Sequence, residues 1–172
     1  MFRRERRMSN DTSLLDEARD CAARNPKRAF ELESRHVAAY PEDSSGYFHR
    51  HFSWIRLGAY DKAMQDCETA IRPNAKPVMF MARGDLYRLL GDHARAVEDF
   101  TRARDLNYED WLTSFGPHHR AGSLARLGRL EDALADCALI ADDHRMPAHR
   151  GLPGGSKTEF IAEIRRLAAR PL

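Results

Sequence analysis

The chain has 172 residues, of which 42% are hydrophobic and 31% charged, and its formal net charge at pH 7 is +2. This length and composition predict a single globular domain and exclude a disordered chain. No apolar run approaches the roughly 18 residues that a membrane-spanning helix needs, and the basic N-terminus lacks the apolar core of a secretory signal.

The excess positive charge lies in a short N-terminal segment. Residues 1–7 contain four arginines and one glutamate, a net charge of +3, which leaves −1 for residues 8–172. We therefore expect residues 1–9 to form a basic, disordered tail, and the rest of the chain lacks the positive charge that nucleic-acid binding requires. A start at Met8 would remove this tail, so whether residues 1–7 are native stays open. Only four of the 28 basic residues are lysines, a bias that we interpret as that of a GC-rich bacterial genome.

Residues 10–43 contain a faint pair of helices. The first carries apolar residues at helical spacing, Leu14, Leu15, Ala18 and Cys21. Asn25-Pro26 and then Ala29 follow in the second half of this block. Pro41 stands at the end of the block.

Three later stretches repeat one pattern, Leu-Gly followed by Ala, Asp and then Cys or Phe. These residues are Leu57, Gly58, Ala63, Asp66 and Cys67; Leu90, Gly91, Ala96, Asp99 and Phe100; and Leu127, Gly128, Ala133, Asp136 and Cys137. The glycines are 33 and then 37 residues apart. A period near 34 residues predicts stacked helical repeats, which we place at about residues 44–76, 77–110 and 114–143.

The middle repeat is the most regular one. Pro77 opens its first helix, and Gly91 ends that helix because glycine accepts the left-handed backbone of a helix stop. Gly84 and Ala96 are small enough for two helices to pack closely, and Phe100 fills the space between this pair and its neighbour.

These repeats resemble the tetratricopeptide repeat (TPR). In the middle repeat the residues that carry the resemblance are Phe80, Gly84, Tyr87, Gly91, Ala96, Phe100 and Ala103. The preceding repeat keeps Tyr47, Trp54, Gly58, Ala63, Cys67 and Ala70, with His51 in place of the small residue. The following repeat keeps Ala121, Leu124, Gly128, Ala133, Cys137 and Ile140, with Pro117 in place of the aromatic after an insertion around Trp111–Gly116. The resemblance covers residues 10–143 and implies an all-α fold, a right-handed α-solenoid of helix-turn-helix repeats.

The C-terminal part of the chain departs from the repeat. Residues 144–155 are rich in Pro, Gly and His and predict a loop, and residues 156–172 predict a final helix. Ser156 and Glu159 have the spacing of a capping box at its start. Because repeat arrays expose an apolar face at each end, we expect this helix to cap the array.

The resemblance also implies where a partner binds. In the family, the first helices of the repeats line a concave groove that holds a peptide or a helix of another protein. The corresponding positions here are Phe48, Phe52, Arg56, Met81, Asp85, Arg88, His118, Gly122 and Arg126. Their aromatic rings and arginines suit a segment with apolar anchors and acidic groups.

Other side chains suggest weaker sites. Gly151–Thr158 comes close to a phosphate-binding loop, but Ser156 replaces its second glycine and no strand precedes it. The histidines lack the converging spacing of metal ligands, and we expect them, including His49, His51, His118 and His119, on the solvated surface. We also expect Asp66, Asp99 and Asp136 on the outer surface, where Lys62 and Arg95 precede the first two by four residues.

Three widely spaced cysteines form no disulfide framework, and we expect a reducing, cytoplasmic setting. We expect no catalytic, metal or cofactor site. The leading hypothesis is a non-enzymatic scaffold or adaptor that binds a protein or peptide. The alternatives are a small secretion-type or assembly chaperone, a nucleotide-binding protein that uses Gly151–Thr158, and a tail that contacts nucleic acid or lipid. The sequence specifies neither the partner, the process nor the oligomeric state.

Overall fold

The computed structural model describes residues 12–72, 76–143, 145 and 154–170, and these residues form ten α-helices. The chain divides into two compact units, residues 1–75 and 76–172. The helices of the first unit are α1 (Thr12–Cys21), α2 (Pro26–Ala39), α3 (Ser44–Arg56) and α4 (Tyr60–Ile71). Those of the second are α5 (Pro77–Leu89), α6 (His93–Leu106), α7 (Tyr108–Thr113), α8 (Gly116–Arg126), α9 (Leu130–Ala138) and α10 (Lys157–Ala168). None of the helices described is long and apolar enough to cross a membrane.

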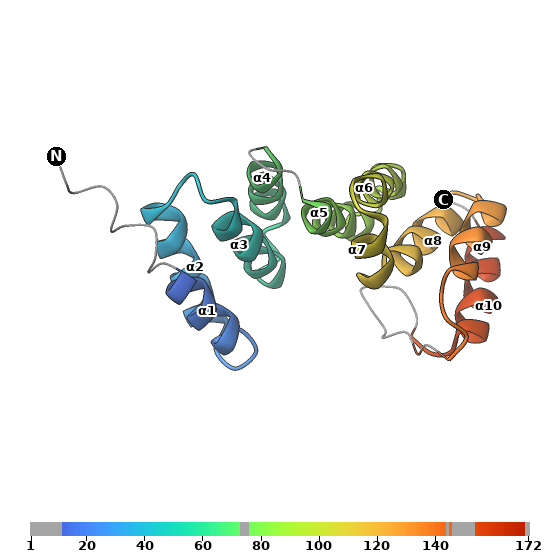
Figure 1. The fold of residues 1–172 in the computed structure, drawn as a ribbon, viewed down its shortest axis with the longest axis horizontal. Coiled ribbons are helices and arrows are strands. Elements are labelled where there is room, and N and C mark those ends of the chain that lie inside the picture. The colour runs from blue at the N-terminus through green and yellow to red at the C-terminus, as the bar shows by residue number, and fades with distance from the viewer. Residues whose placement is uncertain (1–11, 73–75, 144, 146–153, 171–172) are drawn as a thin grey trace. The chain divides into compact units, whose positions relative to one another are not determined.

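The helices of the first unit pack in sequence order, α1 on α2, α2 on α3 and α3 on α4 (Figure 1). Side chains that precede the helices fix where they begin. The Asn25 side chain accepts a hydrogen bond from the Arg28 amide at the start of α2, and Asp43 accepts one from the Ser45 amide at the start of α3. The faint first repeat is therefore a helix pair, as its sequence predicts.

Glycine ends the first helix of each clear repeat, as the sequence predicts. Gly58, Gly91 and Gly128 have φ angles of 72°, 83° and 73°, the left-handed conformation that glycine adopts without a steric penalty. The second helix starts within two residues of each glycine. The repeated Leu-Gly is thus the turn between the two helices of a pair.

The middle repeat packs around Phe100, which is fully buried. Gly84 on α5 lies against this ring: a Cβ atom added there would come within 2.7 Å of Phe100 Cε1. The close approach of α5 and α6 therefore depends on the missing side chain at Gly84. Cys67 and Cys137, which replace Phe100 in the other repeats, are also buried, and this confirms that the position is a packing position.

The insertion between the last two repeats forms the short helix α7. Its Trp111 is fully buried, and the Arg120 guanidinium lies 5.1 Å from the centre of the Trp111 ring. Gly116 lies against the same indole, where an added Cβ atom would clash with Nε1. The extra residues thus extend the core of the second unit.

The C-terminal helix α10 covers α8 and α9, as Figure 1 shows. Both hydrogen bonds of the predicted capping box between Ser156 and Glu159 are present. Phe160, Ile164 and Leu167 are buried in one cluster with the apolar residues of the last repeat. The expectation that this helix caps the last repeat is confirmed.

Each clear repeat is closed by a salt bridge between its two helices. The pairs are Arg50–Asp66, Arg83–Asp99 and Arg120–Asp136. In every pair the guanidinium donates two hydrogen bonds to the carboxylate, over distances of 2.6–2.8 Å. The three aspartate side chains are only 3–7% exposed, so their predicted position on the outer surface is wrong.

The expected partners of these aspartates make other contacts. Lys62 places its Nζ atom 4.6 Å from the centre of the Trp54 ring, and Arg95 pairs with Asp92 at 2.6 Å. The aspartates themselves face the first helix of their own repeat, where arginine forms a planar two-bond contact with a carboxylate. Every one of these arginines lies eight residues before the repeat glycine. This regular spacing indicates the pairing between helices, which a search for partners four residues away on the same helix does not find.

Candidate functional site

The predicted groove residues of the first unit lie along α3. Phe48, Phe52 and Arg56, which we call the α3 stripe, follow one another at intervals of four residues and share one face of the helix. The two phenylalanine rings meet edge to face, with their centres 5.5 Å apart, and both are partly exposed. Arg56 is exposed, and its Nη2 donates a hydrogen bond of 2.9 Å to Ser53 Oγ. The stripe therefore presents two aromatic rings and one positive charge.

The predicted groove residues of the second unit are more deeply packed. Met81, Arg88, His118 and Gly122 are buried, while Asp85 and Arg126 are partly exposed. Asp85 on α5 accepts a hydrogen bond from Arg88 Nη2 at 3.1 Å.

The other contact of Asp85 crosses to a neighbouring helix. His119 Nδ1, on α8, lies 3.0 Å from Asp85 Oδ1. Because α5 and α8 are first helices of adjacent repeats, these polar side chains hold the two repeats together. Asp85, Arg88 and His119 thus contact one another inside the unit.

The histidines are buried more often than the sequence predicts. His36, His51, His118 and His119 are at most 8% exposed, so their expected position on the solvated surface is wrong. His118 stacks against Phe160 of α10, with the ring centres 4.4 Å apart. Imidazole rings thus fill aromatic packing positions here.

His49 is only partly buried, and its pKa is lowered because burial disfavours the charged ring. Within the described ranges, no group of three or more His, Cys, Asp or Glu side chains is placed to hold a metal ion. His144 and His149 lie outside these ranges.

The described part of the phosphate-loop-like segment makes internal contacts. Gly151–Pro153 lie outside the described residues. Lys157 Nζ donates to the Ile140 carbonyl at 2.6 Å and to Asp142 Oδ1 at 2.8 Å. The Glu159 carboxylate accepts a hydrogen bond from the Ser156 amide, and this hydrogen bond lowers the pKa of Glu159. A carboxylate therefore occupies the helix N-terminus where a phosphate would bind.

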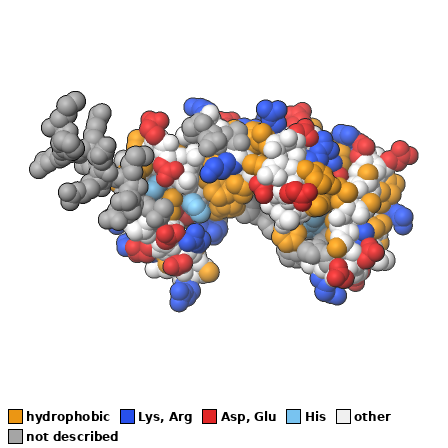
Figure 2. Space-filling view, in the orientation of Figure 1, with side chains coloured by type: hydrophobic (Ala, Val, Ile, Leu, Met, Phe, Trp, Pro, Cys, Tyr) orange, Lys and Arg blue, Asp and Glu red, His pale blue; other side chains and the backbone are white. Residues whose placement is uncertain are grey.

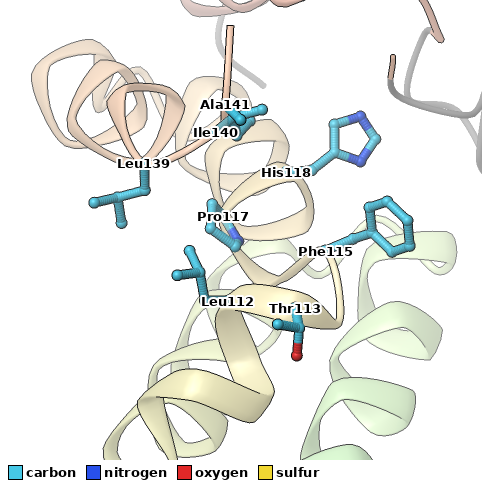
Figure 3. Close-up of a pocket in the computed structure, with 8 residues that line it drawn as sticks. All are labelled: Leu112, Thr113, Phe115, Pro117, His118, Leu139, Ile140 and Ala141. Carbon is cyan, nitrogen blue, oxygen red and sulfur yellow. The ribbon is translucent and has the colours of Figure 1, made fainter. Parts of the chain in front are cut away.

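The second unit also contains an apolar cleft that the sequence does not predict. Its volume is about 300 Å³, and its lining residues are Leu112, Thr113, Phe115, Pro117, His118, Leu139, Ile140 and Ala141. Figure 3 shows that they come from the end of α7, the start of α8 and the segment after α9. The insertion around Trp111–Gly116 is the sequence signal that the regular repeat is interrupted here.

Comparison with known proteins identifies the architecture. No family model and no curated protein matches the sequence. Solved structures of TPR proteins match it along about three quarters of its length. One of them is YrrB, described as a TPR protein with an unusual peptide-binding site. Its sequence is 20% identical to this one, the match covers 73% of this chain and 64% of YrrB, and the TM-score is 0.61.

Two further structures agree. TTC0263, a TPR protein of Thermus thermophilus, is 24% identical over 73% of this chain and 70% of its own, with a TM-score of 0.64. MamA is 15% identical over 76% of this chain and 75% of its own, with a TM-score of 0.66. This chain has the TPR fold. The all-α helical-repeat architecture implied by the sequence resemblance is thereby confirmed. This TPR-fold chain spans less than two thirds of the length of YrrB.

Proposed function

We propose that this TPR-fold protein is a non-enzymatic scaffold that holds a segment of a partner protein against the α3 stripe. The observation that carries the proposal is the exposure of this stripe. Phe48 and Phe52 remain partly exposed and Arg56 is exposed, whereas most of the predicted groove residues of α5 and α8 are buried. Aromatic residues and arginine are the types that most often dominate the energy of an interface.

The chemistry of the stripe favours one kind of partner segment. The paired rings offer an apolar surface, and Arg56, one helical turn further on, offers a positive charge. A segment with an apolar side chain followed by a carboxylate would complement both features. Charged side chains of both signs lie among hydrophobic ones on the face drawn in Figure 2. Such a surface suits a protein partner better than the uniformly basic one that nucleic acid requires.

The test is affinity capture with three forms of the full chain. The wild type is compared with Phe52→Ala/Arg56→Glu and with a control, Arg35→Glu/Tyr60→Ala, which removes an exposed ring and reverses an exposed arginine elsewhere in the same unit. We expect the stripe variant to lose about 10- to 100-fold in affinity for captured partners, because truncation of such residues costs about 1–3 kcal/mol. The control should retain them.

Equal recovery of every partner by the three forms would contradict the proposal. Circular dichroism of each variant establishes that its helices are intact before the comparison is made. Arg88 is unsuitable for this experiment, because its side chain is only 4% exposed and pairs with Asp85, so its reversal would disturb the fold.

A further inference from the structure

Glu33 stands at a position where the other repeats bury an uncharged side chain. It follows Ala29 by four residues, as Cys67 follows Ala63 and Phe100 follows Ala96. The residue is only 4% exposed. The helix α2 therefore carries a carboxyl group at a core position of the first unit, at its contact with α3.

The polar contacts of this carboxyl are incomplete. Ser53 on α3 forms a hydrogen bond with it, and the Ser53 hydroxyl in turn accepts one from Arg56. Within the described part of the chain, Glu33 Oε2 is buried and makes no hydrogen bond. Arg50 is committed to Asp66 by two hydrogen bonds. Among the residues that the structure describes, a carboxylate at this site thus has one hydroxyl partner and no direct counter-ion.

We propose that Glu33 is a pH-sensitive latch between α2 and α3, closed when the carboxyl is neutral and weakened when it ionises. An ionised group that is buried with unfilled acceptor positions loses hydration that the protein does not replace. The neutral acid loses much less. The packing of α2 against α3 then depends on a single proton.

The surrounding charges modify this effect without cancelling it. Arg56 and Arg50 on α3 favour the ionised form, and Asp66 on α4 opposes it. Helix α1, which also packs on α2, buries the apolar Ala18 in a cluster with Ala29 and Leu32 of α2. Burial is the largest influence and raises the pKa of Glu33 from 4.5 to about 6.

The direction of the pH dependence follows from this shift. The folded unit binds the Glu33 proton more tightly than the unfolded chain does, so its stability falls as the pH rises from about 4.5 through 6. His49, whose pKa is lowered by burial, acts in the opposite direction at overlapping pH. The effect of Glu33 is therefore measured as the difference in stability between the wild type and Glu33→Gln. Both proteins contain His49, so its contribution cancels in this difference.

The experiment is native-state hydrogen exchange of the full chain at pH 5.0 and pH 7.5, corrected for intrinsic exchange rates. Glu33→Gln is the test variant, and Glu31→Gln, at an exposed position of the same helix, is the control. The pKa of Glu33 changes from about 6 in the folded unit to 4.5 when the unit opens. Glu33→Gln should therefore raise the protection factors of the α2 and α3 amides, and this increase should be about eightfold larger at pH 7.5 than at pH 5.0. An equal gain at both pH values, or the same pH-dependent gain in Glu31→Gln, overturns the proposal.

A second measurement needs no folded variant. In wild-type protein with ¹³C-labelled glutamate side chains, NMR titration of the carboxyl carbons should give one midpoint near pH 6. If all glutamate midpoints lie near their ordinary value of about 4.3, the latch does not exist.

Discussion

The salt bridge inside each repeat gives the sharpest stability prediction, and Asp99→Asn in the middle repeat is its test. The Asp99 side chain is 7% exposed and the Arg83 side chain 22%, and two hydrogen bonds of 2.8 Å join them. The substitution removes the counter-charge and leaves the guanidinium beside a neutral amide.

Breaking a fully buried pair by removing one partner costs about 3–5 kcal/mol. Arg83 retains some contact with water and lies over the Phe80 ring, 5.7 Å from its centre. We therefore expect a loss of about 2–3 kcal/mol in the free energy of unfolding of the second unit. The matched control is Asp105→Asn, since Asp105 pairs with Arg104 at the surface, where the side chains are 55% and 35% exposed. That loss should be at most about 1 kcal/mol.

The assay is urea unfolding followed by tryptophan fluorescence. The chain has two tryptophans, Trp54 in the first unit and Trp111 in the second, so a Trp54→Phe background makes Trp111 the reporter of the second unit. Both substitutions are compared in that background. If Asp99→Asn costs no more than Asp105→Asn, the salt bridge does not stabilise the repeat and the reasoning is refuted. A double-mutant cycle with Arg83→Met then measures the coupling between the two side chains.

Two further substitutions test the packing and the cap of the second unit with the same assay. Gly84→Ala should destabilise it by about 1–3 kcal/mol, because the new Cβ atom meets the buried Phe100 ring; an unchanged urea midpoint would show that the ring moves freely. Ser156→Ala should cost about 1 kcal/mol through loss of the α10 cap, and a stability equal to that of the wild type would contradict the role of the capping box.

The repeat pattern predicted the architecture because its residues have local roles. A glycine at positive φ, a small residue at a helix contact and an aromatic in the core each carry a signal in their own sequence position. Gly91, Gly84 and Phe100 could therefore be placed before the fold was known, and so could the start of α10 at Ser156.

The errors concern side chains whose partners lie on another helix. The sequence around Asp99 predicts a surface residue, because its partner Arg83 lies on another helix, α5. The eight-residue spacing from arginine to glycine in all three repeats is the sequence signal that could have indicated this pairing. His118 reads as polar surface until α10 covers it with Phe160. The α3 stripe could be predicted as a set of positions, but its greater exposure relative to α5 and α8 depends on which neighbours each first helix meets.

The most direct test of partner binding at the α3 stripe is photo-crosslinking in cells. The photoreactive residue p-benzoylphenylalanine is placed at Phe52, and, as a control, at the exposed Gln65 on the second helix of the same repeat. Binding at the stripe predicts a discrete crosslinked partner from position 52 that is absent from position 65. Crosslinks of equal yield from both positions, or from position 65 alone, would contradict it.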